Sequence, residues 1–367
     1  MKNIVIFSVG LLGASIGAGL KKSGFDGKIL GVSNKKNLEA AISLQAIDEG
    51  VSYDEFLADK NNVLSDCDVL FICSPIISIK TTLEMLATSP SKLKDGLIIT
   101  DVGSTKKEIY ETAQKVLPPQ VKFIAGHPMA GSEKSGAKFA DPFLFQNAVW
   151  VLFANDITDV YKFAAFLEKY LGCKTKCIDP ETHDKIAAVI SHIPHIIAVG
   201  LVNAAEKINR EIDETLGLAA GGFKSMTRIA SSPYRMWHDI YETNREANIE
   251  FLDCFMDEMS QLAQSLKNGT LQADFENAEK IRARLAENQK GFINELYRII
   301  VIAEDKPGFL AKILGILADN NLNVSDIELL KVREGDAGSF MFAFTDESNA
   351  QEAVDLLQTA GFLARIG

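Results

Sequence analysis

Short apolar runs alternate with amphipathic stretches through the first half of the chain, and this alternation limits the fold more than any other feature. A run that is apolar at nearly every position is typical of a strand in a parallel sheet with both faces covered by helices. We therefore predict a doubly wound α/β domain over residues 1–178. The predicted strands cover residues 4–9, 28–33, 68–73, 97–102, 121–125, 149–153 and 174–178, and the predicted helices cover residues 12–22, 38–44 and 105–116.

The pattern changes twice in the second half. Helical periodicity begins at Asp179, and we predict an all-α domain over residues 179–291. The segment 295–367 predicts a βαββαβ order, which is typical of a ferredoxin-like domain. Its predicted strands cover residues 297–303, 323–332, 339–345 and 362–366, and its helices cover residues 309–320 and 350–360.

The charge of the chain excludes one class of partner. Its formal net charge is −11, whereas a nucleic-acid-binding protein needs a basic face. Its five cysteines are odd in number and irregular in spacing, which indicates reduced thiols in a cytoplasmic protein.

The apolar segment 186–205 contains two histidines, a proline, a serine and an asparagine. Such groups are costly in lipid, so we expect a helix buried in protein, with a subunit interface as one place for it, and no membrane contact.

A nucleotide-binding motif follows the first predicted strand. The segment Ser8-Val9-Gly10-Leu11-Leu12-Gly13 is the dinucleotide fingerprint with serine in the first glycine position. Gly10 would let the backbone approach a pyrophosphate, and Gly13 would let the helix pack closely on the strand. The helix start, with Leu11 and Leu12, supplies free N–H groups for phosphate. The alternative is an ordinary tight turn between a strand and a helix.

The end of the second strand bears on the choice of cofactor. NAD-binding domains usually place an acid there, but this chain has Ser33, Asn34 and Lys35. These groups suit a 2′-phosphate, so we predict that NADP is tolerated as well as NAD. The alternative is that the lysines only begin a solvated helix. Ser74, where the strand 68–73 ends, completes the expected cofactor-binding set.

A histidine marks the predicted catalytic edge. His127 lies in the segment 126–133, which follows a predicted strand and therefore reaches the carboxyl edge of the sheet, where such folds bind ligands. Its unperturbed pKa lies near neutral pH, which suits a general base. Ser104 follows the preceding strand and should share that edge. The alternative for a lone histidine is a structural role.

Two further groups fall in the helical segment. His192 and His195 are three residues apart and share one helix face. We expect polar anchors in a cleft, with buried core histidines as the alternative, and no metal site, because no third and fourth ligand has suitable spacing. Arg228 follows the glycine pair at 221–222, and its planar guanidinium suits a carboxylate, with a structural ion pair as the alternative.

Together these motifs resemble the prephenate/arogenate dehydrogenase family over about residues 3–290. The shared motifs are SVGLLGAS at the start, Asp101-Val102-Gly103-Ser104, His127-Pro128-Met129-Ala130-Gly131-Ser132-Glu133, Ser191-His192-Ile193-Pro194-His195, and Thr227-Arg228-Ile229-Ala230 with Trp237. The tail resembles an ACT domain through Asp305-Lys306-Pro307-Gly308 and its element order.

The resemblance implies a Rossmann-type nucleotide domain, a homodimer built through the helical domain, and tyrosine as the effector of the ACT domain. It implies that His127 is the base for the ring hydroxyl and that Ser104 helps to hold that hydroxyl and the histidine. It implies that Arg228 binds the substrate carboxylate, with Lys224 as the alternative. His195 and Glu133 match residues of the substrate pocket, the latter near the side chain. The substrate is then prephenate or arogenate, and Ser8 and Ser33 depart from the family pattern.

Two competing interpretations remain. A β-hydroxyacid dehydrogenase shares this architecture and uses a lysine that His183-Asp184-Lys185 imitates, but it leaves the segment after His127 unexplained. A catalytically inactive sensor of nucleotide and amino acid is disfavoured by the intact set of His127, Ser104 and Arg228.

Overall fold

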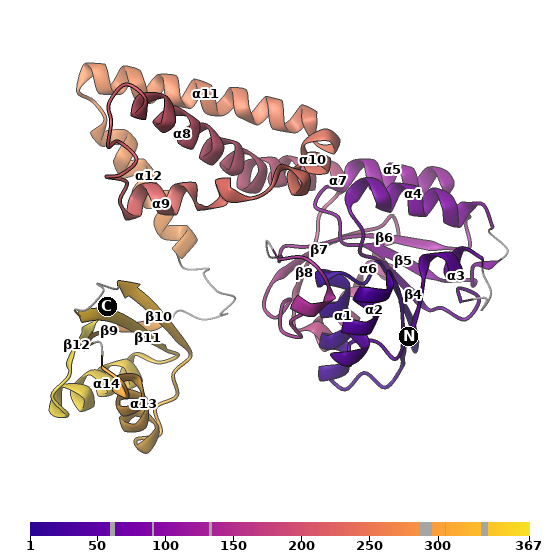
Figure 1. Cartoon of the computed structure of the whole chain (residues 1–367), viewed down its shortest axis with the longest axis horizontal. Helices are drawn as coiled ribbons and strands as arrows, with labels where there is room; N and C mark the ends of the chain where they lie inside the picture. The colour runs from indigo at the N-terminus through magenta and orange to yellow at the C-terminus, as the bar shows by residue number, and fades with distance from the viewer. Residues whose placement is uncertain (59–62, 90–91, 132–133, 287–295, 305, 332–336) are drawn as a thin grey trace. The chain divides into compact units, whose positions relative to one another are not determined.

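The chain divides into two compact units, Met1–Leu271 and Gln272–Gly367, and each is described by itself (Figure 1). The computed structural model describes residues 1–367 except 59–62, 90–91, 132–133, 287–295, 305 and 332–336.

An eight-stranded sheet forms the centre of the first unit, in the order β3-β2-β1-β4-β5-β6-β7-β8. Its strands are β1 (Asn3–Phe7), β2 (Lys28–Val32), β3 (Glu49–Val51), β4 (Val69–Ile72), β5 (Ile98–Asp101), β6 (Lys122–Pro128), β7 (Val149–Phe153) and β8 (Lys174–Cys177). The order runs outward from β1 in both directions, so the loops after β1 and β4 flank the switch point at which such folds bind ligands. The predicted doubly wound α/β fold is confirmed.

Two strands, β7 and β8, run against the predicted direction. β7 pairs with β6 antiparallel, whereas the other neighbours in the sheet are parallel. A parallel return needs a long crossover, usually a helix. The described residues between 129 and 148, which leave out 132–133, contain only the short 3₁₀ helix η2 (Ala137–Phe139), so the chain turns back beside β6.

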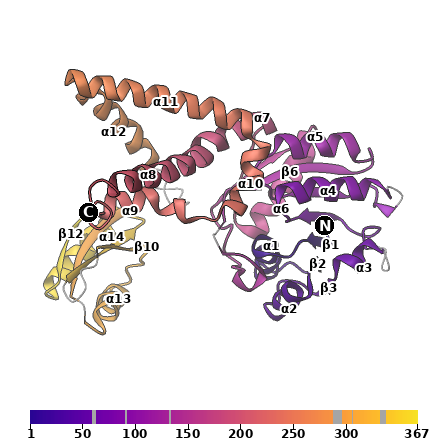
Figure 2. The ribbon, with the colours of Figure 1, turned by 45° about the horizontal axis from the view of Figure 1, so that its top comes forward.

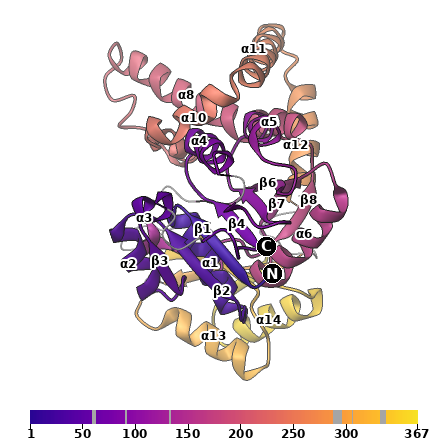
Figure 3. The ribbon, with the colours of Figure 1, turned by 90° about the vertical axis from the view of Figure 1, so that its right-hand side faces the viewer.

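Helices cover both faces of the sheet, and each face has its own apolar core. Figures 1 and 3 show α4 and α5 on one side and α1, α2 and α6 on the other, which agrees with the two clusters of buried side chains. The helices are α1 (Leu11–Lys22), α2 (Lys35–Ser43), α3 (Tyr53–Leu57), α4 (Ile76–Ala87), α5 (Lys107–Val116) and α6 (Ile157–Leu171). Because strand side chains alternate between faces, Ile4 and Ile6 enter one core while Val5 and Phe7 enter the other.

A helical segment completes the first unit and packs beside α4 and α5 (Figure 2). Its elements are α7 (Pro180–Ala187), the π-helical turn η3 (Ala188–His192), α8 (Ile193–Asn209), α9 (Gly221–Thr227), η4 (Arg228–Ser231), α10 (Tyr234–Thr243) and α11 (Arg245–Asn268). The wide turn η3 ends two residues before Pro194, which has no N–H to donate to the preceding turn. Within the described residues, Pro180–Asn209 is a helical run that is long enough and apolar enough to cross a membrane. A third of its most apolar stretch is buried inside the protein.

The second unit has a four-stranded antiparallel sheet in the order β10-β11-β9-β12. Its elements are α12 (Gln272–Ala286), β9 (Tyr297–Glu304), α13 (Phe309–Asp319), β10 (Asp326–Lys331), β11 (Ala337–Phe344), α14 (Glu347–Thr359) and β12 (Leu363–Ile366). The helices α13 and α14 bury Leu317 and Leu357 against Val301 and Phe342 of the sheet. From β9 onward the element order is βαββαβ, so the predicted ferredoxin-like domain is confirmed.

Candidate active site

The turn after β1 places a serine in a backbone conformation that favours glycine. Ser8 has φ +71°, and its N–H donates to the carbonyl of Val32 over 2.8 Å. A side chain in this left-handed region costs about 1–2 kcal/mol, which is the reason that glycine is usual here. The hydroxyl of Ser8 lies 3.0 Å from the hydroxyl of Tyr53 in α3, and this hydrogen bond offsets part of the strain.

The following residues leave room for a phosphate. A Cβ atom built on Gly10 would meet nothing closer than the Ser8 carbonyl oxygen at 4.0 Å, whereas one on Gly13 would lie 2.9 Å from a methyl group of Ile6. Gly10 therefore keeps open space, and Gly13 allows α1 to pack on the strand. No side chain caps α1, so the N–H groups at its start, with Leu11 and Leu12, remain available to an anion.

The ends of β2 and β4 each carry a buried hydroxyl without a partner. The Oγ atoms of Ser33 and Ser74 are buried, and neither has a hydrogen-bond partner among the described residues. Buried polar atoms are normally satisfied, so these two orphaned hydroxyls fit a ligand that binds here. Asn34 is already engaged, because its side chain accepts from the N–H of Asn37 and caps α2. The Lys35 ammonium is largely exposed and lies 3.9 Å from Glu39.

His127 lies near the carboxyl end of β6, as the sequence predicts, and is half-buried. Its Nδ1 atom lies 2.8 Å from Nε2 of His183 in α7. Burial lowers the pKa of His127 well below 6.5, and positive charge at His183, Lys106 and His192 would lower this pKa further. The imidazole is therefore neutral at pH 7 and can accept a proton.

A buried ion pair holds the strands beside His127 in place. The ammonium of Lys106 donates to the carboxylate of Asp101 and, over 2.7 Å, to the carbonyl of Gly126. Asp101 also accepts from the N–H groups of Gly103 (2.8 Å) and Gly126 (3.1 Å). Because these contacts join the end of β5 to the residue before His127, they fix the backbone that carries the imidazole.

Ser104 follows β5 and is half-buried at the same edge of the sheet. No hydrogen bond joins its hydroxyl to His127 or to another group in the part of the chain that the structure describes. Ser104 thus lies at the same edge of the sheet as His127, but the predicted contact between the two side chains is not formed in the free protein.

The two histidines of the helical segment are both buried, and each has side-chain partners: Asn248 and Asn244 (3.3 Å) for His192, and Tyr241 for His195. Nδ1 of His192 lies 3.0 Å from the Asn248 amide oxygen, and burial lowers the pKa of His192 to about 4. Nδ1 of His195 lies 2.8 Å from the Tyr241 hydroxyl, and its ring stacks on Trp237 with centroids 3.8 Å apart. Nε2 of His195 is buried without a partner within the described residues, which fits a ligand contact at that atom.

Two cations lie on the neighbouring helical turns. Arg228 begins η4, and Lys224 lies in α9; both are exposed. Neither side chain makes an ion pair or hydrogen bond within the described parts of the chain, so both remain available to an anion. Glu133, the other predicted substrate contact, lies outside the described residues.

The sequence interpretation missed the partners of the catalytic histidine. His183 and Asp184 were considered only as imitators of a lysine motif, yet His183 contacts Nδ1 of His127 and Asp184 contacts the other ring nitrogen of His183. Lys106 was also missed. The available signal was the adjacent His-Asp pair at the start of a helix and a lysine two residues after Ser104.

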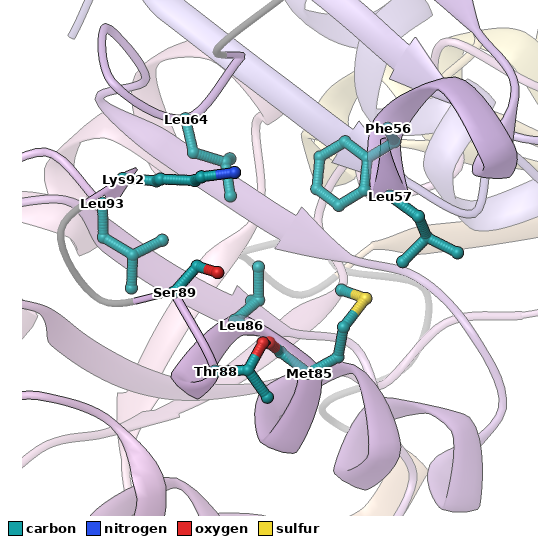
Figure 4. A pocket seen from close by; sticks show the side chains of 9 residues that line it. All are labelled: Phe56, Leu57, Leu64, Met85, Leu86, Thr88, Ser89, Lys92 and Leu93. Atoms are coloured by element: carbon teal, nitrogen blue, oxygen red, sulfur yellow. The ribbon is translucent and has the colours of Figure 1, made fainter. Parts of the chain in front are cut away.

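The apolar cavity in Figure 4 is a separate feature. It lies between α3 and the C-terminal end of α4 and is lined by residues that include Phe56, Leu64 and Met85. Since α4 begins at the carboxyl edge of the sheet, its C-terminal end lies at the opposite edge, away from Ser8 and His127.

Three domain families match the chain in succession. The prephenate dehydrogenase nucleotide-binding domain matches residues 16–179, the prephenate dehydrogenase dimerization domain matches residues 179–280, and the ACT domain matches residues 297–362. A prephenate dehydrogenase of Bacillus subtilis (strain 168) is 32% identical over 361 residues, covering 97% of this chain and 95% of the relative. The chain belongs to the prephenate dehydrogenase family.

Other members of the prephenate dehydrogenase family agree in sequence and structure. A prephenate dehydrogenase of Lactococcus lactis subsp. cremoris (strain MG1363) is 34% identical and covers 98% of each chain. The structure of prephenate dehydrogenase from Aquifex aeolicus with hydroxyphenyl propionate and NAD+ has a TM-score of 0.69 and 28% identity, covering 78% of this chain and 98% of that one. Arogenate dehydrogenase of Synechocystis has a TM-score of 0.66 and 29% identity, covering 78% and 100%. The chain is thus an NAD(P)-dependent oxidoreductase of this family with a C-terminal ACT domain.

Proposed function

We propose that the chain oxidises and decarboxylates prephenate to 4-hydroxyphenylpyruvate in tyrosine biosynthesis. The supporting observation is the neutral imidazole of His127 at the carboxyl edge of the sheet, together with the full-length similarity to enzymes named prephenate dehydrogenase. Arogenate is the second candidate, because the Synechocystis arogenate dehydrogenase is nearly as similar in structure as the Aquifex aeolicus prephenate dehydrogenase.

In this proposal, His127 accepts the proton of the ring hydroxyl through Nε2, and Ser104 helps to hold that hydroxyl. A general base contributes about 10²–10⁴-fold to a rate. Loss of CO₂ from the opposite ring carbon then leaves an aromatic ring, which makes the reaction irreversible. When bound, the nicotinamide cofactor takes up the hydride.

The substrate carboxylates are assigned to the cations of the helical segment. Arg228 binds one carboxylate through its planar guanidinium, and Lys224 is the alternative. Nε2 of His195 and the carboxylate of Glu133 complete the pocket around the substrate side chain. These local cations are needed because the whole chain carries a net charge of −11.

We propose that NADP is accepted as well as NAD. Ser33 stands where an acid would repel a 2′-phosphate, and its buried hydroxyl has no partner in the described chain. The residues that would hold the cofactor are Ser8, Gly10, Leu11, Leu12, Gly13, Ser33, Asn34, Lys35 and Ser74. Gly10→Ala tests this site, because the added methyl group fits the free protein but crowds a phosphate. We expect an unchanged melting temperature and a raised KM for the cofactor.

The assembly and regulation follow from the other domains. We propose a cytoplasmic homodimer formed through the helical segment, which exposes large apolar side chains. Examples are Ile190, Ile208, Met256 and Leu266, at 59%, 47%, 58% and 66% exposure. We also propose that tyrosine is the effector of the ACT domain. We assign residues 1–178 to cofactor binding, 179–291 to substrate binding and dimerisation, and 295–367 to regulation.

Steady-state kinetics with both substrates and both cofactors, with and without tyrosine, test these proposals. We expect turnover with prephenate above that with arogenate and inhibition by tyrosine. His127→Asn should lower kcat sharply with little change in KM, and Arg228→Ala should chiefly raise KM. A His127→Asn enzyme with near-normal kcat would refute the role of the imidazole.

A further inference from the structure

A chain of three side chains ends at the proposed base. Nδ1 of His127 lies 2.8 Å from Nε2 of His183, and Nδ1 of His183 lies 2.8 Å from Oδ1 of Asp184. His183 and Asp184 are almost fully buried, with 2% and 3% of their surface exposed. His127 comes from the sheet and the other two from α7, so packing between these elements brings the three together.

The start of α5 holds the carboxylate of Asp184 in a fixed orientation. Its Oδ1 accepts from the N–H of Lys106 over 2.7 Å, and its Oδ2 accepts from the N–H of Lys107 over 2.9 Å. N–H groups at a helix start and the positive end of the helix dipole both favour an ionised carboxylate. An ionised carboxylate can only accept hydrogen bonds.

The positions of the protons follow from this one fixed acceptor. Because Asp184 only accepts, Nδ1 of His183 must carry the proton between them. A neutral His183 then has its lone pair on Nε2, which faces His127. Nδ1 of His127 must therefore carry a proton, and its Nε2 is left with the free lone pair.

We propose that His183 and Asp184 are positioning residues that hold His127 in the tautomer whose Nε2 accepts the substrate proton. This inference rests on the proposed function. In water a histidine ring exchanges freely between its two neutral tautomers, so without His183 part of the population would carry the proton on Nε2 and could not act as a base. The pair thus selects the competent form before the substrate arrives.

The charges around His127 act in the same direction. The titratable groups that face it are His183 from α7, Lys106 from the start of α5 and His192 from η3. Each would be positive when protonated and disfavours a proton on His127. A second proton on His183 would make its Nε2 a donor, and His127 would then have to turn its own lone pair toward His183. Catalysis thus needs both rings neutral.

The kinetic test compares two substitutions at His183. His183→Leu removes the acceptor, and we expect kcat to fall about 10-fold or more with KM for the substrate nearly unchanged. His183→Gln keeps an amide oxygen within reach of Nδ1 of His127, and we expect it to recover part of that loss. His238→Leu is the matched control, because His238 also lies 3.0 Å from the aspartate that follows it but is exposed. We expect its kcat to stay at the wild-type value.

A spectroscopic test reads the tautomer without any substrate. In the ¹⁵N-histidine-labelled full-length enzyme, we assign the His127 signals by their loss in His127→Asn. We expect a protonated Nδ1 and an unprotonated Nε2 in the wild type and in His183→Gln, and a mixture of tautomers in His183→Leu. In the His127→Asn background, His183→Leu should lower kcat no further, since the pair acts through His127.

The outcomes are distinct. An unchanged His127 tautomer in His183→Leu overturns the inference, as does an equal loss of kcat in the Leu and Gln variants. If His183→Leu does not fold, the His127 tautomer and kcat of His183→Gln decide, and a protonated Nε2 there would overturn it. A wild-type enzyme inactive on prephenate and arogenate would refute the proposed function, and the spectroscopic result would still decide the role of His183.

Discussion

Replacing Lys106 by methionine should destabilise the first unit strongly. The side chains of Lys106 and Asp101 are 2% and 0% exposed, and methionine would fill the space of the lysine stem but leave the carboxylate of Asp101 without its cation. Breaking a buried ion pair by removing one partner costs about 3–5 kcal/mol. Asp101 keeps the N–H groups of Gly103 and Gly126, so we place the loss near the lower end, at about 3 kcal/mol.

The loss converts into a measurable shift. For a unit of this size each kcal/mol lowers the melting temperature by about 2–4 °C, so we expect a fall of about 6–12 °C at pH 7. Thermal unfolding followed by circular dichroism measures it. Lys80→Met is the matched control: Lys80 pairs with Glu108 over 2.6 Å, but their side chains are 31% and 39% exposed. Such a pair contributes about 0–1 kcal/mol.

The same substitution has a second consequence. The charge of Lys106 helps to lower the pKa of His127, after burial and His183, so its removal raises that pKa. The acid limb of the kcat/KM profile should then move to higher pH. Asp101→Asn added to Lys106→Met removes the buried charge and should recover part of the lost stability. A Lys106→Met protein whose melting temperature lies within about 2 °C of wild type, and whose kcat/KM falls at the same acid pH as wild type, would refute the reasoning.

Three further predictions concern single residues. Because burial lowers the pKa of His127 well below 6.5, kcat/KM should stay flat down to pH 6.5 and fall only below that pH, where the ring takes up a proton. A fall in kcat/KM already between pH 7.5 and 7, up to roughly one unit above the usual histidine pKa, would contradict this. Ser8→Gly in a Tyr53→Phe background removes the strain at φ +71° with no hydrogen bond left to lose, so urea unfolding should show a gain of about 1 kcal/mol. Gly17→Ala would place a methyl group 2.1 Å from the carbonyl oxygen of Ala46, and we expect calorimetry to show a loss of about 2–3 kcal/mol; an unchanged melting temperature would mean that the backbone there yields easily.

Local motifs made much of the fold predictable. Most strands of the nucleotide domain are compact apolar runs, with β3 and β8 as exceptions. Gly10 and His127 lie within a few residues of strand ends, so their place at the sheet edge follows from the fold. The direction of β7 was not predictable in this way, because it depends on the structure that the intervening chain forms. The described residues between 129 and 148 form one short 3₁₀ helix and no crossover helix.

Contacts between distant segments account for the rest. His183 meets His127 across 56 positions of sequence, and nothing local to either residue encodes that meeting. For Asn34, by contrast, a contact with a residue close in sequence was overlooked. The sequence interpretation assigned its side chain to phosphate, whereas in the free protein it caps its own helix, since Asn37 offers an N–H only three residues away.

The carboxylate of Asp184 joins two tasks that are usually separate. It accepts from the N–H groups at the start of α5, and it also ends the hydrogen-bonded chain that leads to His127. A hinge movement that pulled α7 away from α5 would break the helix cap and the proton alignment in one step. Assembly of the first unit and competence of its imidazole are therefore not independent properties, and a substitution at the α5–α7 boundary should lower turnover as well as stability.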